Sequence, residues 1–166
     1  MTATVFGTGT LHTVATDERP SLPDRQPDVV VTERERGLRV ELTASPRAFS
    51  IVRALTRSVP ADYGADPGLA ESAELIVSEL MGNVVRVSPE DEPVPLIVEV
   101  YASSTGVEVI VHDAVPGQPN RRDDVALDSA EAMAGRGLHL LDLLTDRWTV
   151  EPSPLGKQIR CHLRAE

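Results

Sequence analysis

The sequence contains a single cysteine, Cys161, so a disulfide bond within the chain is excluded. Chains without disulfides are typical of reducing compartments, and we therefore expect a cytoplasmic protein. Long apolar runs are also missing, and none approaches the roughly 18 residues that would indicate a membrane span. The N-terminus lacks the basic segment followed by an apolar one that marks a secretion signal. We expect no membrane contact.

Positive charge and aromatic side chains are scarce as well. Aromatic residues make up 3% of the chain, so the core must consist mainly of Val, Leu, Ile and Ala. The 16 basic residues are outnumbered by 26 acidic ones, which gives a net charge of −10. This balance disfavours direct binding to nucleic acid, because a phosphate backbone attracts a positive field. A single nucleotide stays compatible, since it needs only a local pocket of donors.

Length and composition indicate one folded domain that follows an extension. A chain of 166 residues is long enough for one domain with a core and too short for two comfortable ones. Residues 1–36 contain scattered glycines and prolines and end in a charged run, and the short apolar run 29–31 has no periodic partner nearby. We predict that residues 1–36 form a flexible N-terminal extension and that residues 37–166 form the domain.

Two hydrophobic periodicities divide this domain into elements. Apolar residues alternate with polar ones in the predicted strands and recur every three or four positions in the predicted helices. The polar stretch 114–134 has little pattern, and a loop of this length is typical of a functional lid or of disorder. The predicted order is strand 38–43, helix 47–59, helix 69–87, hairpin strands 98–101 and 107–112, helix 137–145, and strands 148–150 and 159–163.

This order of elements predicts the fold class. Strands joined by hairpins pair antiparallel, and the helices then gather on one face of the sheet. We therefore predict an α+β fold, a two-layer α/β sandwich with a mainly antiparallel sheet.

The predicted helix 69–87 has a polar face opposite its apolar stripe. Glu79, Asn83 and Arg86 are spaced by four and three residues, so they share this face. An amide oxygen at Asn83 could complete a magnesium shell, and Glu79 could orient or deprotonate a hydroxyl group. The alternative is the solvated face of an ordinary amphipathic helix. The apolar stripe consists of Leu69, Ala73, Ile76, Leu80, Val84 and Val87.

Asp113 ends the second hairpin strand, and Gly117 follows it in a segment that breaks the strand. A carboxylate at this position can accept a hydrogen bond from an exocyclic amine such as that of adenine. The alternative is an ordinary turn, because Asp, Pro and Gly are common turn formers.

Two further segments pair glycine with a basic residue. Gly135, Arg136, Gly137 and Leu138 precede a short helix, where backbone N–H groups, the helix terminus and a guanidinium could bind phosphate. The alternative is a flexible hinge. Gly156 and Lys157 begin the last strand, where they either bring the backbone close to a base or form a hairpin turn.

Taken in order, these segments resemble the GHKL ATPase superfamily, which includes histidine-kinase ATPase domains, gyrase B, Hsp90 and MutL. The resemblance covers about residues 38–164 and rests on Glu79 to Asn83, Asp113 to Gly117 and Gly135 to Leu138. The run 135–148 is most similar to stand-alone anti-sigma-factor serine kinases of the actinobacterial type.

The resemblance implies a Bergerat-type sandwich that binds ATP with Mg²⁺. It implies that Asn83 binds the metal and that Glu79 is the general base. The residues that it assigns to ATP binding are Asn83, Arg86, Asp113, Gly117, Gly135, Arg136, Gly137, Leu138, Gly156 and Lys157, and it places the ATP lid at residues 117–134.

The resemblance also implies partners, because such kinases sequester a sigma factor, phosphorylate a serine or threonine of a STAS-domain antagonist and often form homodimers. Three positions depart from the family pattern. Val115 replaces a glycine after Asp113, Val87 replaces a histidine, and the last box, Gly156 to Ile159, lacks its usual threonine.

Two functions therefore stay open on sequence alone. The first is an anti-sigma factor that is also a protein serine/threonine kinase. The second is a nucleotide-binding or nucleotide-free interaction module without kinase turnover. A sensor-kinase fragment is disfavoured, because residues 1–36 offer only His12 and no helix pair for dimerisation.

Overall fold

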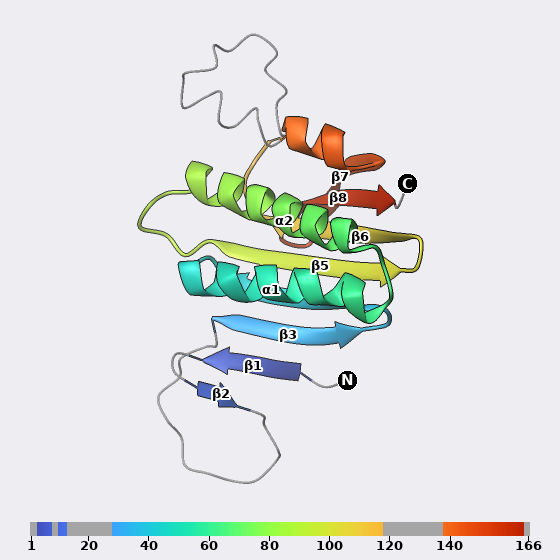
Figure 1. The fold of residues 1–166 in the computed structure, drawn as a ribbon. Helices are drawn as coiled ribbons and strands as arrows, with labels where there is room; N and C mark the ends of the chain where they lie inside the picture. The colour runs from blue at the N-terminus through green and yellow to red at the C-terminus, as the bar shows by residue number, and fades with distance from the viewer. Residues whose placement is uncertain (1–2, 8–9, 13–27, 118–137, 165–166) are drawn as a thin grey trace.

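The computed structural model describes residues 3–7, 10–12, 28–117 and 138–164. Its described strands form one antiparallel sheet, and the helices lie on one face of that sheet (Figure 1). The predicted α+β two-layer sandwich is confirmed. From one edge to the other, the order is β2 (Thr10–His12), β1 (Ala3–Gly7), β3 (Val29–Arg34), β4 (Gly37–Thr43), β5 (Pro95–Ser103), β6 (Gly106–Asp113), β8 (Gly156–Arg164) and β7 (Arg147–Ser153).

Two long helices cover the sheet, and local sequence explains where each begins. In α1 (Pro46–Asp62), the Ser45 side chain accepts a hydrogen bond from the Ala48 N–H. In α2 (Pro67–Val87), the Asp66 side chain accepts one from the Gly68 N–H. Both helices start with proline, whose fixed φ suits the first helical position. Neither long helix among the described residues has the length and apolar character required to cross a membrane.

The core lies between the sheet and the helices and is built from aliphatic side chains. The inward residues of β4, β5, β6 and β8 alternate with outward ones, as the period of two predicts. A helical segment at 138–144 adds Leu138 and Leu141 to the same core. The largest fully buried side chains include Ile76, Met81, Leu96, Leu141 and Leu163.

The predicted extension, residues 1–36, contains the strands β1, β2 and β3 of this sheet. Residues 29–34 form β3, which pairs antiparallel with β4, and Val29 and Val31 are buried in the core. The apolar run 29–31 thus pairs with β4 on one side and with β1 on the other, where the sequence suggested no partner. The structure therefore differs from the prediction at this boundary, because strand pairing joins residues 29–34 to the domain.

Side-chain exposure departs from the predicted pattern at three positions. Val87 ends the predicted apolar stripe of α2 but is 61% exposed, because α2 terminates at this residue. Ile110 and His112 occupy the outward positions of β6, yet both are buried. The alternation of residues along one strand cannot predict how far side chains on the neighbouring strands bury a residue.

Candidate functional site

The candidate residues of three distant segments come together at one end of the sheet. α2 packs against β6 and β8. Figure 1 shows that α2 and β6 end, and β8 begins, on the same side of the molecule. The pairing of β6 with β8 sets Asp113 directly opposite Lys157. The sheet therefore joins the Asp113 segment to the Gly156–Lys157 segment, and α2 supplies the third group.

The polar face of α2 lies as the spacing predicted. Leu80, Met81 and Val84 are buried, while Glu79 and Asn83 are half-buried. Arg86 is exposed, and its Nη1 donates a hydrogen bond of 2.5 Å to Asn83 Oδ1. The proposed magnesium ligand is thus held by a cation from the next turn of its own helix.

Asp113 is the most buried polar residue of this end, with an exposed fraction of 2%. Its Oδ1 accepts hydrogen bonds from the Val115 N–H at 2.8 Å and from Lys157 Nζ at 2.7 Å. Lys157 Nζ also donates to the Val115 carbonyl. Burying a carboxylate is costly unless it is paired, and Lys157 provides the charge that offsets this cost.

The start of β8 approaches the end of β6 very closely. A Cβ built at Gly156 would lie 2.8 Å from the Asp113 carbonyl oxygen and 3.1 Å from the Ala114 Cα. Because these are backbone atoms, only glycine fits without a shift of the chain. Gly117 has a φ of 89°, which also favours glycine. Both glycines thus have backbone reasons for their positions beside Asp113.

The phosphate-binding segment of the prediction falls outside the described residues, except at its end. Gly135, Arg136, Gly137 and the predicted lid after Gly117 lie in the range 118–137, which the structure does not describe. Leu138 is described, and it is buried in the core together with Leu141. These two leucines fix the first turn of the helical segment 138–144 against the sheet.

Sequence reasoning named Lys157 but missed its contact with Asp113. It considered a close backbone approach or a turn at Gly156 and Lys157. The ion pair depends on the register between β6 and β8, which are separated by more than 40 residues, Asp113 and Lys157 being 44 apart. A regular hairpin pattern in β5 and β6 does not define that register, so no local signal could have revealed the contact.

The face of the sheet away from the helices carries a separate charged network. Glu99 Oε1 lies 2.8 Å from His112 Nε2 and 3.3 Å from Arg39 Nη1, and the Tyr101 hydroxyl donates to Glu99 Oε2. The hydrogen bond from His112 lowers the pKa of Glu99 to about 2, and burial with the Glu99 hydrogen bond raises the pKa of Tyr101 to about 12. His112 precedes Asp113 in β6 but points to the opposite face, so the sheet separates this network from Asp113.

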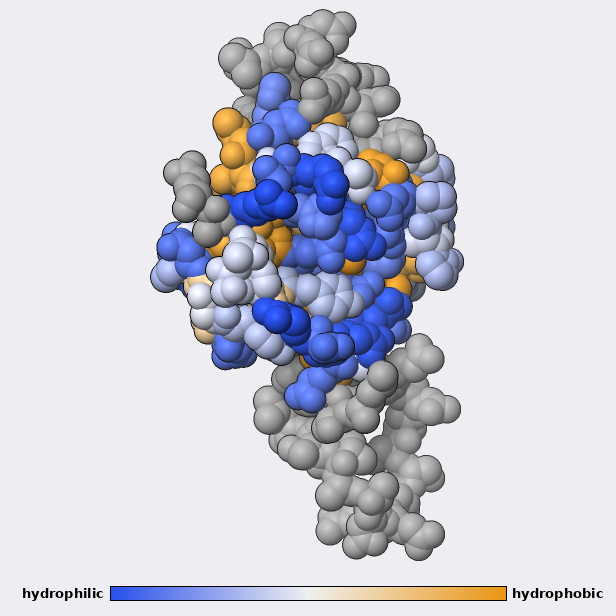
Figure 2. Space-filling view, turned by 90° about the vertical axis from the view of Figure 1, so that its right-hand side faces the viewer, coloured by the Kyte–Doolittle hydropathy of each residue, from blue (hydrophilic) through white to orange (hydrophobic). Residues whose placement is uncertain are grey.

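A hollow of about 610 Å³ lies at the other end of the sheet. Figure 2 looks onto this end and shows a largely hydrophilic surface. Acidic and basic side chains balance there, so the hollow has no net attraction for a polyanion. The charged residues around it are Glu35, Arg36, Glu108, Asp146, Arg147 and Arg164.

Comparison with models of protein families agrees with the fold. A search of curated proteins found no match. The family model described as the histidine kinase-like ATPase domain matches residues 42–163, about three quarters of the chain. The matched range runs from the end of β4 into β8 and contains every candidate residue from Glu79 to Lys157. The chain therefore belongs to the histidine kinase-like ATPase domain family, within the GHKL superfamily.

Proposed function

We propose that this protein binds ATP with Mg²⁺ at the end of the sheet where α2, β6 and β8 meet, and that it regulates transcription through this site. One observation carries the proposal. In a domain of the histidine kinase-like ATPase family, Asn83, Asp113 and Lys157 lie at one end of the fold although the sequence separates them widely.

The donor and acceptor groups at this end fit a magnesium nucleotide. The Asn83 amide oxygen is a hard ligand of the type that Mg²⁺ prefers. Arg86 supplies a guanidinium suited to phosphate. Asp113 uses Oδ1 for its partners within the protein, while Oδ2 has no hydrogen-bond donor among the described residues. A buried carboxylate with one free acceptor is suited to an amine of the ligand, such as the 6-amino group of adenine.

The proposed reaction is phosphoryl transfer to a serine or threonine hydroxyl of a protein. ATP supplies the γ-phosphoryl group, and Mg²⁺ neutralises charge on the phosphates. Glu79 is the proposed general base. It is half-buried, lies one turn before Asn83, and has no hydrogen-bond or ion-pair partner in the described part of the chain. Its carboxylate can therefore accept the proton of the attacking hydroxyl. The backbone of Gly135, Arg136 and Gly137 is proposed to surround the phosphates.

The partners in this proposal are a STAS-domain antagonist, which is phosphorylated, and a sigma factor, which is sequestered. We place the protein in the cytoplasm, as a homodimer. The support comes from the resemblance of residues 79–83, 113–117 and 135–148 to anti-sigma-factor serine kinases. ATP is the phosphate donor in this scheme, and no direct contact with nucleic acid or membrane is required.

One contact favours a second candidate, a protein-interaction module without kinase turnover. Arg86 already donates to the Asn83 oxygen that the metal would need. If this hydrogen bond persists, Mg²⁺ must compete with a cation of the protein itself, and phosphoryl transfer would be slow or absent. The module would then act through sequestration of a partner alone.

Labelled ATP and a purified STAS-domain partner distinguish the two candidates. The kinase predicts a labelled partner with the wild type and loss of label with Glu79→Gln or Asn83→Ala. Ser78→Ala is the matched control, because its hydroxyl donates within α2 to the Glu74 carbonyl and its loss should leave transfer intact. Partner binding without any label, unchanged by Glu79→Gln and Asn83→Ala, would support the module and contradict the kinase.

A further inference from the structure

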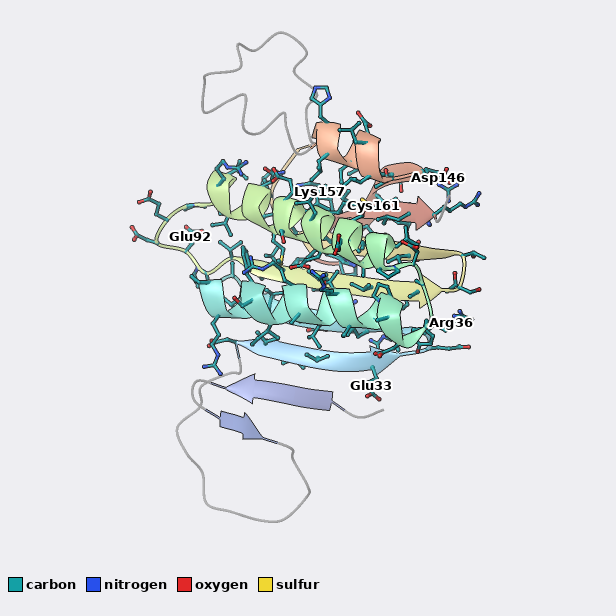
Figure 3. All side chains as sticks on the ribbon, in the orientation of Figure 1. Glu33, Arg36, Glu92, Asp146, Lys157 and Cys161 are labelled. Carbon is teal, nitrogen blue, oxygen red and sulfur yellow. The ribbon has the colours of Figure 1, made fainter. Side chains whose placement is uncertain are left out.

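The first residues of β8 place an ammonium group against the buried carboxylate of Asp113. In the view of Figure 3, Lys157 lies between α2 and the helical segment 138–144. The Lys157 side chain is 17% exposed and that of Asp113 is 3% exposed. Water is therefore largely kept from the ion pair, yet part of the Lys157 side chain can still be reached from outside. A group that is both held in place and reachable can contact a ligand.

The hydrogen bonds of this pair leave one donor and one acceptor free. An ammonium has three N–H donors. Lys157 uses one on Asp113 Oδ1 and one on the Val115 carbonyl. The Val115 N–H also donates to Oδ1, whereas Oδ2 receives no donor from the described residues. The third ammonium proton and Asp113 Oδ2 thus remain for a ligand, side by side on a rigid strand pair.

A donor beside an acceptor is complementary to one edge of adenine. Adenine carries a donor, its 6-amino group, next to an acceptor, ring nitrogen N1, with one ring carbon between them. We propose that Lys157 is a specificity-determining residue that donates a hydrogen bond to N1 of adenine while Asp113 accepts one from the 6-amino group. This inference rests on the proposed ATP binding and adds the residue that recognises N1.

A purely structural role for Lys157 makes a different prediction. Its bonds to Asp113 and Val115 could simply fasten the chain after β6. Loss of the ammonium would then weaken the binding of nucleotides with and without N1 equally, because each of them would bind to the same distorted site. If Lys157 instead recognises N1, loss of its ammonium weakens the binding only of ligands that have this nitrogen.

The test compares ATP with 1-deaza-ATP, in which a C–H group replaces N1 and the 6-amino group is kept. Calorimetric titration with Mg²⁺ gives both dissociation constants for the wild type, Lys157→Met and Lys157→Arg. We expect the wild type to bind ATP about tenfold more tightly than 1-deaza-ATP, since one hydrogen bond from a charged donor contributes at least this factor to the affinity. Lys157→Met should bind the two ligands equally, and Lys157→Arg should keep part of the preference.

Gln158→Met is the matched control, because Gln158 follows Lys157 in β8 but donates to Glu151 on the other face of the sheet. Its preference for ATP should equal that of the wild type. If Lys157→Met does not fold, the double variant Asp113→Asn/Lys157→Met replaces it, because this variant has no buried carboxylate without an ion-pair partner. The double variant should also bind ATP and 1-deaza-ATP equally. If the wild type binds ATP and 1-deaza-ATP equally, or if Lys157→Met keeps the preference for ATP, the inference about Lys157 is refuted while the proposed ATP binding stands. Absence of any ATP binding by the wild type refutes the proposed function and this inference together.

Discussion

Replacing Gly82 with alanine should stabilise this protein. Gly82 lies inside α2, where glycine costs about 1 kcal/mol relative to alanine because it loses more conformational freedom on folding. A Cβ built at Gly82 meets no heavy atom of the described residues within 4 Å, so the added methyl group has no steric cost there. We expect the free energy of unfolding to rise by about 0.5–1 kcal/mol and Tm to rise by roughly 1–4 °C.

Thermal and urea unfolding, followed by far-UV circular dichroism, measure this change. Gly156→Ala is the matched control, because its Cβ would lie 2.8 Å from the Asp113 carbonyl oxygen. That variant should be less stable than the wild type. A lower Tm for Gly82→Ala, or shifts of the same sign in both variants, would refute the reasoning. Stabilisation of Gly82→Ala accompanied by weaker ATP binding would place the nucleotide against this turn of α2.

Three further predictions concern the sheet and its core. The pKa of Glu99 is about 2 in the folded protein, against an ordinary value of 4.5. The ionised carboxylate therefore stabilises the fold at a pH above 4.5, and this contribution is lost as the pH falls toward 2. The stability gap between the wild type and Glu99→Gln should therefore shrink as the pH falls from about 4.5 toward 2 in urea titrations. A gap that stays constant through this range would count against the network. Leu141→Ala should cost about 2–5 kcal/mol of unfolding free energy, whereas Leu143→Ala, at an 81% exposed position, should change it by less than about 0.5 kcal/mol. Cys161 is fully buried and burial raises the pKa of its thiol to about 12, so a thiol-reactive dye should label it only after denaturation.

Short-range signals were sufficient to predict most of the fold. The helices predicted at 47–59 and 69–87 form at Pro46–Asp62 and Pro67–Val87, because apolar spacing acts within a few turns. The second helix begins two residues earlier than predicted, where Asp66 caps it and Pro67 takes the first helical position. The turn between Ser103 and Gly106 likewise defines the β5–β6 hairpin. The polar face of α2 followed from helical spacing alone.

Long-range pairing accounts for what the sequence did not reveal. Val29 and Val31 belong to the core because β3 pairs with β4, and their own neighbours in sequence contain no sign of that partner beyond β-branched character. The Lys157–Asp113 contact depends in the same way on the β6–β8 register. His112 is buried by cross-strand neighbours, so its exposure could not be read from alternation.

Calorimetric titration of the wild type with ATP, in the presence and absence of Mg²⁺, tests the central claim most directly. The account predicts saturable binding of one nucleotide per chain, tighter with Mg²⁺ than without it, and loss of the Mg²⁺ effect in Asn83→Ala. A flat titration under both conditions, with no change in Tm on adding ATP, would contradict it.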